Sequence, residues 1–150
     1  MNAVLGTRKK GLEFIKQISE VIAKATGFEK TLEKVKLTDG GEGKCTAEFT
    51  VASEHLNLQG GLHGGFTATL VDMMTTYALV SKPCHAGVSV ELHVSYLTVA
   101  KKGDQVIIDA NCIRAGRKLA YIECELRQKK DGSIIAKGNQ TKFVDFQRNY

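Results

Sequence analysis

Residues 57–72 read NLQGGLHGGFTATLVD, a glycine-rich turn around His63 that continues directly into a hydrophobic helix. The first backbone N–H groups of such a helix lack intrahelical partners and lie at the positive end of its dipole, and Gly64 lets a ligand approach them closely. This arrangement suits a developing oxyanion. Asp72 follows among apolar residues, where an unpaired charge costs about 2–5 kcal/mol. The stretch therefore predicts a site with a polarising turn and a carboxylate.

Helix geometry limits how these two features can act together. Gly64 and Asp72 are eight residues apart, which corresponds to about 12 Å along a helix axis. A carbonyl group held at the Gly64 N–H therefore cannot also touch Asp72 of the same chain. Either the two features are unrelated, or they meet across a dimer in which two copies of the helix pack antiparallel. We favour the dimer, which would contain two equivalent sites.

Composition sets the outer bounds. The 150 residues with 43% hydrophobic composition predict a single domain over residues 1–150, with a core large enough to be stable without disulfide bonds or a structural metal. The four cysteines show neither CxxC nor zinc spacing, and no secretory signal precedes them, so we expect reduced thiols in a cytoplasmic protein. The net charge of +5 comes without a nucleic-acid-binding motif and fits a phosphorylated small molecule equally well. No apolar run reaches the roughly 18 residues of a membrane helix, so we expect no stable membrane insertion.

The N-terminal third reads as a helix and a hairpin. Residues 7–28 carry apolar side chains at helical spacing and predict an amphipathic surface helix, so residues 1–28 form an N-terminal helical segment. Its basic start is also compatible with a mitochondrial address, but Glu13 and Glu20 weaken that alternative, and a packing helix is preferred. Residues 31–37 and 44–51 predict two strands joined by a turn at residues 39–41.

After a central helix over residues 65–81, the hydrophobic period changes from helical to two. In the next strand an apolar face alternates with a polar face that includes Ser89 and Glu91. The same alternation over residues 106–112 and 120–126, turns at 115–116 and 131–132, and a last strand over 134–146 predict a mostly antiparallel sheet. Because each strand buries one face, we predict an α+β fold in which this sheet wraps around the central hydrophobic helix.

Each candidate site residue has a functional and a structural interpretation. Asp72 lies in a narrow polar stripe of threonines, and we predict that it acts as a general base. The alternative is that Asp72 belongs to a structural hydrogen-bond cluster. His63 is placed to bind a substrate, but a histidine in a turn is often a helix cap. Asn57 is placed to orient His63, or is an ordinary loop residue. Ser89 has no neighbouring base in sequence, so it orients a water rather than acting as a nucleophile.

Basic residues fall at strand ends and turns, where they can meet phosphates: Lys101, Lys102, Arg114, Arg117 and Lys118. Ordinary solvated charges are the alternative, and we expect it to hold for at least half of them. The remaining histidines show no ligand spacing, so we expect no metal site.

Four segments together resemble a known family. They are the run HLNLQGGLHGGFTATLVDMMTTYAL, the strand GVSVELHVSYL, the turn AKKGDQV and the hairpin RAGRKLAY. They are similar to the hotdog-fold acyl-coenzyme A thioesterases of the PaaI-like group, and the match covers nearly the whole chain. LHGG followed by TATLVD is the specific part. One departure is the segment 98–100, where a proline is common in the family, which concerns the shape of the loop and not the chemistry.

The resemblance implies a hotdog fold with an extra N-terminal helix, and hydrolysis of fatty acyl-coenzyme A of medium to long chain length. It implies that the Gly64 N–H, helped by His63 and Asn57, polarises the thioester carbonyl. Asp72 from the opposite subunit would act as general base or as nucleophile, with Ser89 helping to place the water. It also implies contacts to coenzyme A from Glu91, Tyr96, Leu97, Thr98, Val99, Ala100, Lys101, Arg114, Ala115, Gly116, Arg117, Lys118 and Leu119.

The same resemblance implies no metal and no redox cofactor, since coenzyme A is part of the substrate and product, and it implies a homodimer that assembles into a homotetramer as a dimer of dimers. Two other functions compete. One is a hotdog dehydratase acting on 3-hydroxyacyl thioesters, and the other is a non-catalytic acyl-coenzyme A sensor, which the intact set of Asn57, His63, Asp72 and Ser89 disfavours. A DNA-binding regulator would need an appended recognition domain.

Overall fold

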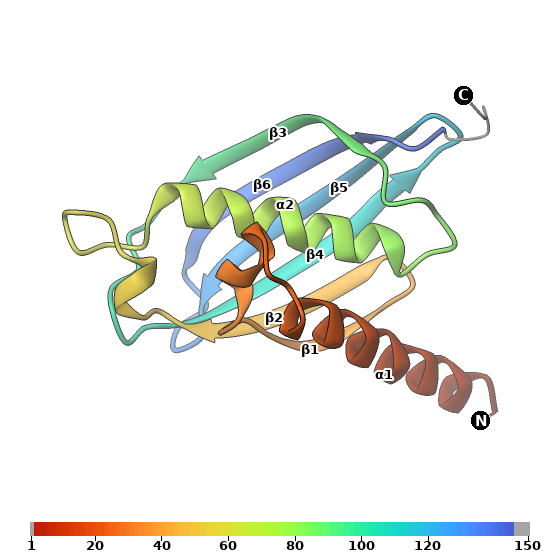
Figure 1. Ribbon diagram of the computed structural model, residues 1–150, viewed down its shortest axis with the longest axis horizontal. Helices are drawn as coiled ribbons and strands as arrows, with labels where there is room; N and C mark the ends of the chain where they lie inside the picture. Colours follow the sequence, from red (N-terminus) through yellow and green to blue (C-terminus); the bar gives the residue numbers. More distant parts are fainter. Residues whose placement is uncertain (1, 146–150) are drawn as a thin grey trace.

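The computed structural model describes residues 2–145, of which 2–9 are described by their backbone alone, and shows a sheet with one long helix across it (Figure 1). All six strands pair antiparallel, in the order β1-β2-β4-β5-β6-β3. The elements are α1 (Asn2–Ala23), η1 (Phe28–Leu32), β1 (Lys36–Gly41), β2 (Lys44–Thr50), η2 (Ser53–His55), α2 (Gly64–Val80), β3 (Val88–Tyr96), β4 (Gln105–Ala115), β5 (Leu119–Gln128) and β6 (Ile134–Phe143). The predicted α+β architecture is confirmed.

Helix α2 forms the centre of the hydrophobic core. It contacts β2, β3, β4, β5 and β6, and Leu70, Val71 and Leu79 are fully buried. Burial of one such side chain contributes about 1.5–3 kcal/mol. Gly138 on β6 permits the close approach, because a Cβ atom there would lie 2.7 Å from Val71 Cγ1. The predicted central helix over residues 65–81 is confirmed within one residue at each end.

The boundaries of the N-terminal elements differ from the prediction. Helix α1 ends at Ala23 rather than at residue 28, and the predicted start of the first strand is the 3-10 helix η1. The hairpin turns at Glu42 and Gly43, and not at residues 39–41, because both of these residues adopt the positive φ that a tight hairpin turn needs. Gly40 instead remains in β1 and packs against the Phe14 ring of α1.

Two further findings concern the last strand and the character of the helices. Strand β6 ends at Phe143, and position 146 of the predicted last strand lies outside the described residues. No helix within residues 2–145 combines the length and the apolar character needed to cross a membrane.

Strand β3 follows α2 in the chain but lies at the far edge of the sheet, beside β6 (Figure 1). A bulge between Ser89 and Glu91 interrupts its pairing with β6. Because one extra residue reverses the side to which the following side chains point, Ser89 shares the helix-facing side with Leu92. The prediction that Ser89 belongs to the polar face with Glu91 is therefore wrong. The register pairs Ser89 with Lys142, whose amino group reaches α2.

Candidate active site

The glycine-rich turn is held in place by main-chain hydrogen bonds. Leu62 N–H donates to the Ala100 carbonyl at 2.8 Å, and His63 N–H donates to the His55 carbonyl at 2.8 Å. Asn57 Oδ1 accepts N–H groups of its own turn, from Gln59 at 2.9 Å and from Gly61 at 3.1 Å. Asn57 therefore shapes the turn, and its side-chain oxygen is not used to orient His63.

His63 is oriented by its own position at the start of α2. Its Nδ1 atom accepts the Gly65 N–H at 2.8 Å, so the neutral ring carries its proton on the exposed Nε2 atom. The Gly64 N–H has no hydrogen-bond partner among residues 2–145, and the Tyr96 hydroxyl donates to the Gly64 carbonyl at 2.9 Å. The Gly64 N–H and the His63 Nε2–H are thus two hydrogen-bond donors at the positive end of this helix, where an anion is favoured.

Asp72, two turns farther along α2, is held by a buried amide. Gln140 Nε2 donates to Asp72 Oδ1 at 2.6 Å and to Ser89 Oγ at 2.7 Å. The Gln140 side chain is fully buried, and its Oε1 atom accepts the Thr75 hydroxyl at 2.6 Å. Asp72 and Ser89, which are distant in sequence, therefore accept hydrogen bonds from the same amide group. The structure therefore brings these two predicted site residues together, and their catalytic cooperation stays a prediction.

A buried cation accompanies the carboxylate. Lys142 is 5% exposed, and its Nζ atom donates to Thr76 Oγ1 at 2.7 Å. Burial lowers the pKa of Lys142, while the charge of Asp72 acts in the opposite direction. The predicted polar stripe of α2 is thus matched by polar residues of the sheet.

Sequence reasoning missed Gln140 and Lys142 as members of the site. Strand β6 reads IIAKGNQTKF, with polar residues at both alternating positions after Ala136, so its periodicity does not show which side chains face the helix. The pairing register shows it, because Gln140 lies opposite Leu92 and Ile122. A signal was available in hindsight, since a helix carrying one carboxylate requires a polar partner on the sheet.

All the residues predicted to contact coenzyme A, except Glu91, fall into two groups. Tyr96 and the segment to Lys101 lie beside the glycine-rich turn, where Lys101 pairs with Gly61. The segment from Arg114 to Leu119 forms the β4–β5 turn at the opposite end of the sheet (Figure 1). Because β3 separates the two ends by eight residue steps, they are about 26 Å apart in one chain.

Two of the residues predicted to contact coenzyme A have particular surroundings. Ala100 is fully buried and its carbonyl supports the turn, so its side chain is not accessible to a ligand, contrary to the predicted contact. Glu91 pairs with Thr141 on the side of β3 that faces away from α2.

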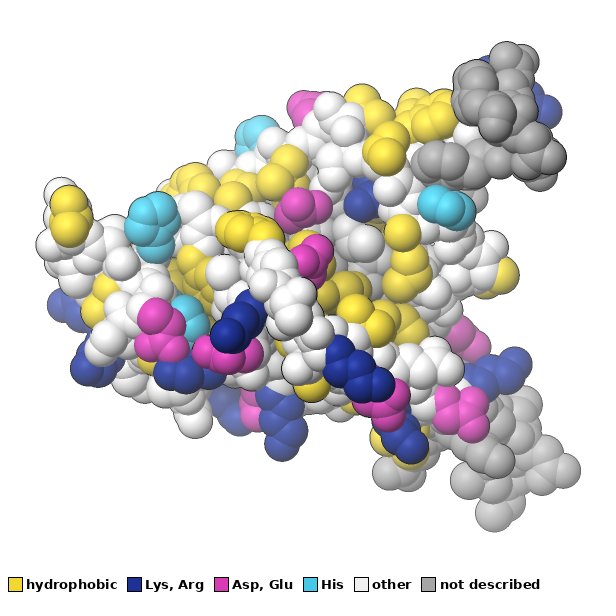
Figure 2. Space-filling model, viewed as in Figure 1, with side chains coloured by type: hydrophobic (Ala, Val, Ile, Leu, Met, Phe, Trp, Pro, Cys, Tyr) yellow, Lys and Arg dark blue, Asp and Glu magenta, His cyan; other side chains and the backbone are white. Residues whose placement is uncertain are grey.

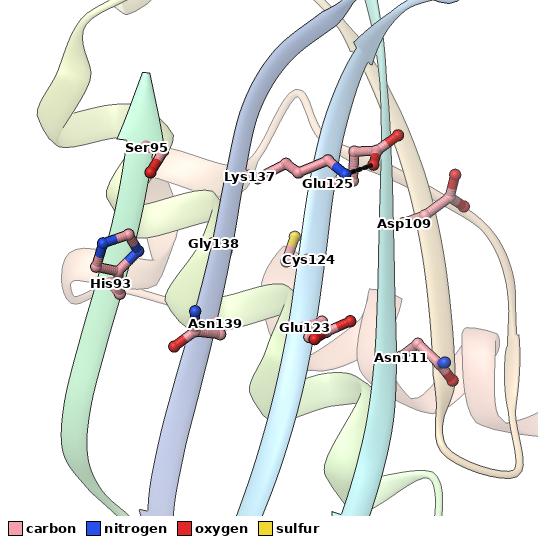
Figure 3. Close-up of a pocket in the computed structure, with 10 residues that line it drawn as sticks. All are labelled: His93, Ser95, Asp109, Asn111, Glu123, Cys124, Glu125, Lys137, Gly138 and Asn139. Carbon is pink, nitrogen blue, oxygen red and sulfur yellow. Dashed lines mark ion pairs between the residues drawn. The ribbon is translucent and has the colours of Figure 1, made fainter. Parts of the chain in front are cut away.

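The outer face of the sheet carries a separate hollow of about 430 Å³ (Figure 3). Its side chains are mostly charged or amide groups, among them Asp109, Glu123 and Lys137, and Lys137 pairs with Glu125 at 3.3 Å. These side chains point away from α2 (Figure 3) and do not join the groups around Asp72 and Gly64.

The buried cysteines are poor candidates for an alternative nucleophile. Burial raises the pKa of the Cys45 thiol to about 12 and also raises the pKa of the Cys124 thiol, so both thiols stay protonated.

Comparisons with known proteins agree with this geometry. The profile of the Thioesterase superfamily matches residues 59–135, which include the turn, α2 and Ser89. Acyl-coenzyme A thioesterase 13 of Mus musculus is 39% identical over 131 residues, covering 87% of this chain and 94% of that protein. The chain belongs to the Thioesterase superfamily.

Solved structures of this superfamily share the fold. Zebrafish thioesterase superfamily member 2 superposes with a TM-score of 0.85 at 38% identity, covering 89% of this chain and 98% of that one. A hypothetical thioesterase of Streptococcus pneumoniae, solved with coenzyme A, has a TM-score of 0.72 at 26% identity, covering 78% and 90%. The hotdog fold and the resemblance to hotdog acyl-coenzyme A thioesterases are confirmed.

In this member of the superfamily, Gln140 should stabilise the fold through its hydrogen bonds to buried polar side chains. Gln140→Met should lower the free energy of unfolding by about 1–3 kcal/mol, because Asp72, Ser89 and Thr75 lose a buried partner. The measurement is chemical denaturation, with Asn139→Met, on the outer face of the same strand, as the matched control. The control should change stability by less than about 0.5 kcal/mol. Equal losses in the two variants would contradict the assigned role of Gln140.

Proposed function

We propose that this protein hydrolyses acyl-coenzyme A thioesters, with medium- to long-chain fatty acyl groups, at sites shared between two subunits. The observation that carries the proposal is that α2 bears two kinds of group. The Gly64 N–H at its start has no hydrogen-bond partner among the described residues, and the Asp72 carboxylate lies farther along the same helix. The family membership and the coenzyme A named for the Streptococcus pneumoniae relative support the substrate class. The apolar surface of α2 beside Asp72 supports an acyl substrate.

The thioester carbonyl would be polarised at the start of α2. Its oxygen would accept hydrogen bonds from the Gly64 N–H and from His63 Nε2–H, and the negative charge that develops during attack would lie at the positive end of the helix dipole. The Tyr96 hydroxyl donates to the Gly64 carbonyl and so holds the peptide that follows this donor at the start of the helix. Such preorganised donors stabilise the transition state more than the ground state.

Asp72 would supply the base or the nucleophile. Gln140 donates a hydrogen bond to its Oδ1 atom, so Oδ2 would be the oxygen that takes part in the reaction. As a base, Asp72 takes a proton from water, whose oxygen bonds to the carbonyl carbon, and the C–S bond then breaks while the proton passes to the coenzyme A thiolate. As a nucleophile, Asp72 itself displaces the thiolate, and water then hydrolyses the acyl-aspartyl anhydride. In either route the Ser89 hydroxyl would help to place the water.

A dimer through β3 would unite the two halves of the site. Strand β3 is an edge strand, and it exposes Val88, Val90 and Leu92 by 55%, 60% and 39%. Figure 2 shows hydrophobic side chains at the surface along this edge. An uncovered apolar edge favours pairing with another strand, and a two-fold axis makes that pairing antiparallel.

The proposed pairing also accounts for the two distant groups of predicted contacts. If it is centred on Leu92, the partner subunit's Val88 lies opposite Tyr96. The partner subunit's Ser89 and Asp72 then approach Gly64, since Gln140 links that pair at the Val88 end of β3. The partner subunit's β4–β5 turn approaches Tyr96 and Lys101, so that one coenzyme A would contact both groups. A further assembly of two dimers into a tetramer rests on the resemblance alone.

The first test addresses Asp72. Asp72→Asn keeps the size of the side chain and an oxygen that can accept the Gln140 hydrogen bond, but it removes the charge. It should lower kcat for acyl-coenzyme A hydrolysis by at least about 100-fold, the usual scale for loss of a general base. Steady-state kinetics with a series of acyl chain lengths measures this and the chain-length preference together. Turnover close to wild type by a correctly folded variant would remove Asp72 from the mechanism.

The second test addresses the phosphates of coenzyme A. Arg114→Ala or Lys118→Ala should raise KM by about 2–5-fold with little change in kcat, and the effect should shrink as salt rises, because exposed charges contribute modest, screened binding energy. The exposed Lys16→Ala on α1 is the matched control. A truncated thioester without the nucleotide should respond to none of the three substitutions. Equal losses on the full and truncated substrates would instead assign Arg114 and Lys118 to the fold.

A further inference from the structure

His55 packs directly beneath the glycine-rich turn. Its side chain is 3% exposed. The ring stacks on the Phe66 ring with centroids 4.5 Å apart and an interplanar angle of 4°, and it meets the Phe49 ring edge-on at 5.3 Å. Phe66 belongs to the first turn of α2, three residues after His63. The aromatic stack therefore joins the end of η2 to the helix end that carries the free N–H group.

The polar atoms of His55 join two further segments. Its Nδ1 atom accepts the Ala52 N–H at 3.0 Å, and its backbone carbonyl accepts the His63 N–H at 2.8 Å. One buried residue thus connects the chain leaving β2, the turn at His63 and the first turn of α2. His63 N–H is the donor that immediately precedes the proposed oxyanion site, so its anchor sets the path of the backbone into Gly64.

We propose that His55 is a positioning residue for thioester hydrolysis: by holding Ala52, His63 and Phe66 together, it aims the Gly64 N–H and the His63 imidazole at the carbonyl oxygen. The inference rests on the function proposed above. Orientation matters at this point because a misplacement of about 1 Å at a catalytic group can cost about 100-fold in rate. The role needs the neutral form of the ring, since a protonated Nδ1 cannot accept the Ala52 N–H.

The surroundings of His55 favour that neutral form. Burial lowers the pKa of His55 from its ordinary value of 6.5, and Lys34 acts in the same direction, whereas Glu54 opposes it. Lys34 and Glu54 pair with each other, and Lys30 and Glu33 share a hollow with His55. Because the pKa is lowered on folding, the neutral ring contributes stability that is present above about pH 6.5 and is lost as pH falls through the folded-state pKa. The turn should therefore lose its anchor at acidic pH.

The experiment compares His55→Phe with the wild-type protein. Phenylalanine keeps the stack on Phe66 but removes the acceptor for Ala52. We expect kcat for acyl-coenzyme A to fall about 10–100-fold with KM within about 2-fold, because the loss concerns an interaction made in the transition state. The ratio of wild-type to variant kcat should shrink as pH falls, since protonation imposes the same loss on the wild-type protein. Lys16→Ala, at an exposed position of α1 outside the proposed interface, is the control and should leave kcat and its pH profile unchanged.

The outcomes separate this inference from the proposed function. If the wild-type protein hydrolyses no acyl-coenzyme A, the proposed function fails, and the inference fails with it. If the wild-type protein is active and folded His55→Phe matches its kcat, or loses kcat by a factor independent of pH, the positioning role alone is overturned. Should His55→Phe not fold, Phe66→Leu decides, because it removes the stack without touching a titratable group. A drop in kcat of about 10-fold at constant KM supports the role, and unchanged kcat overturns it.

Discussion

Helix α2 is a rigid spacer between the two groups that the chemistry requires. Its first free N–H group, at Gly64, and its only carboxylate, at Asp72, are separated by about 12 Å of continuous helix. No side-chain rotation closes that distance within one chain. The proposed sharing of the site between subunits follows from this constraint, because an antiparallel partner reverses the order of the same two groups.

The position of α2 on the sheet depends in turn on one close contact. Gly138 leaves room for Val71, and the adjacent Asp72 then reaches the amide of Gln140. The cost of burying these polar groups is offset because each has a partner, which also gives the helix one preferred position over the sheet. Packing and chemistry are thus linked, since the close approach of Val71 to Gly138 places Asp72 within reach of Gln140.

Much of the architecture was predictable because it follows from the pattern of neighbouring residues in the sequence. The helical run of α2, the alternation of β4 and β5, and the glycine-rich turn ahead of Asp72 each follow from neighbours in sequence. The bulge in β3 and the role of Gln140 do not, since they depend on pairing between segments far apart in the chain. Gln140 lies 68 residues from Asp72 and 51 from Ser89, and only the strand register brings the three together.

The most direct test of the shared site is subunit complementation. His63→Ala and Asp72→Asn proteins, each inactive alone, are mixed under conditions that exchange subunits, and mixed dimers are confirmed by mass. A mixed dimer contains one site with all its groups intact and one site that lacks both, so random exchange of equal amounts should restore about a quarter of the wild-type sites. Recovery of acyl-coenzyme A hydrolysis near that level is the predicted result. Mixed dimers that form and remain inactive would contradict the account.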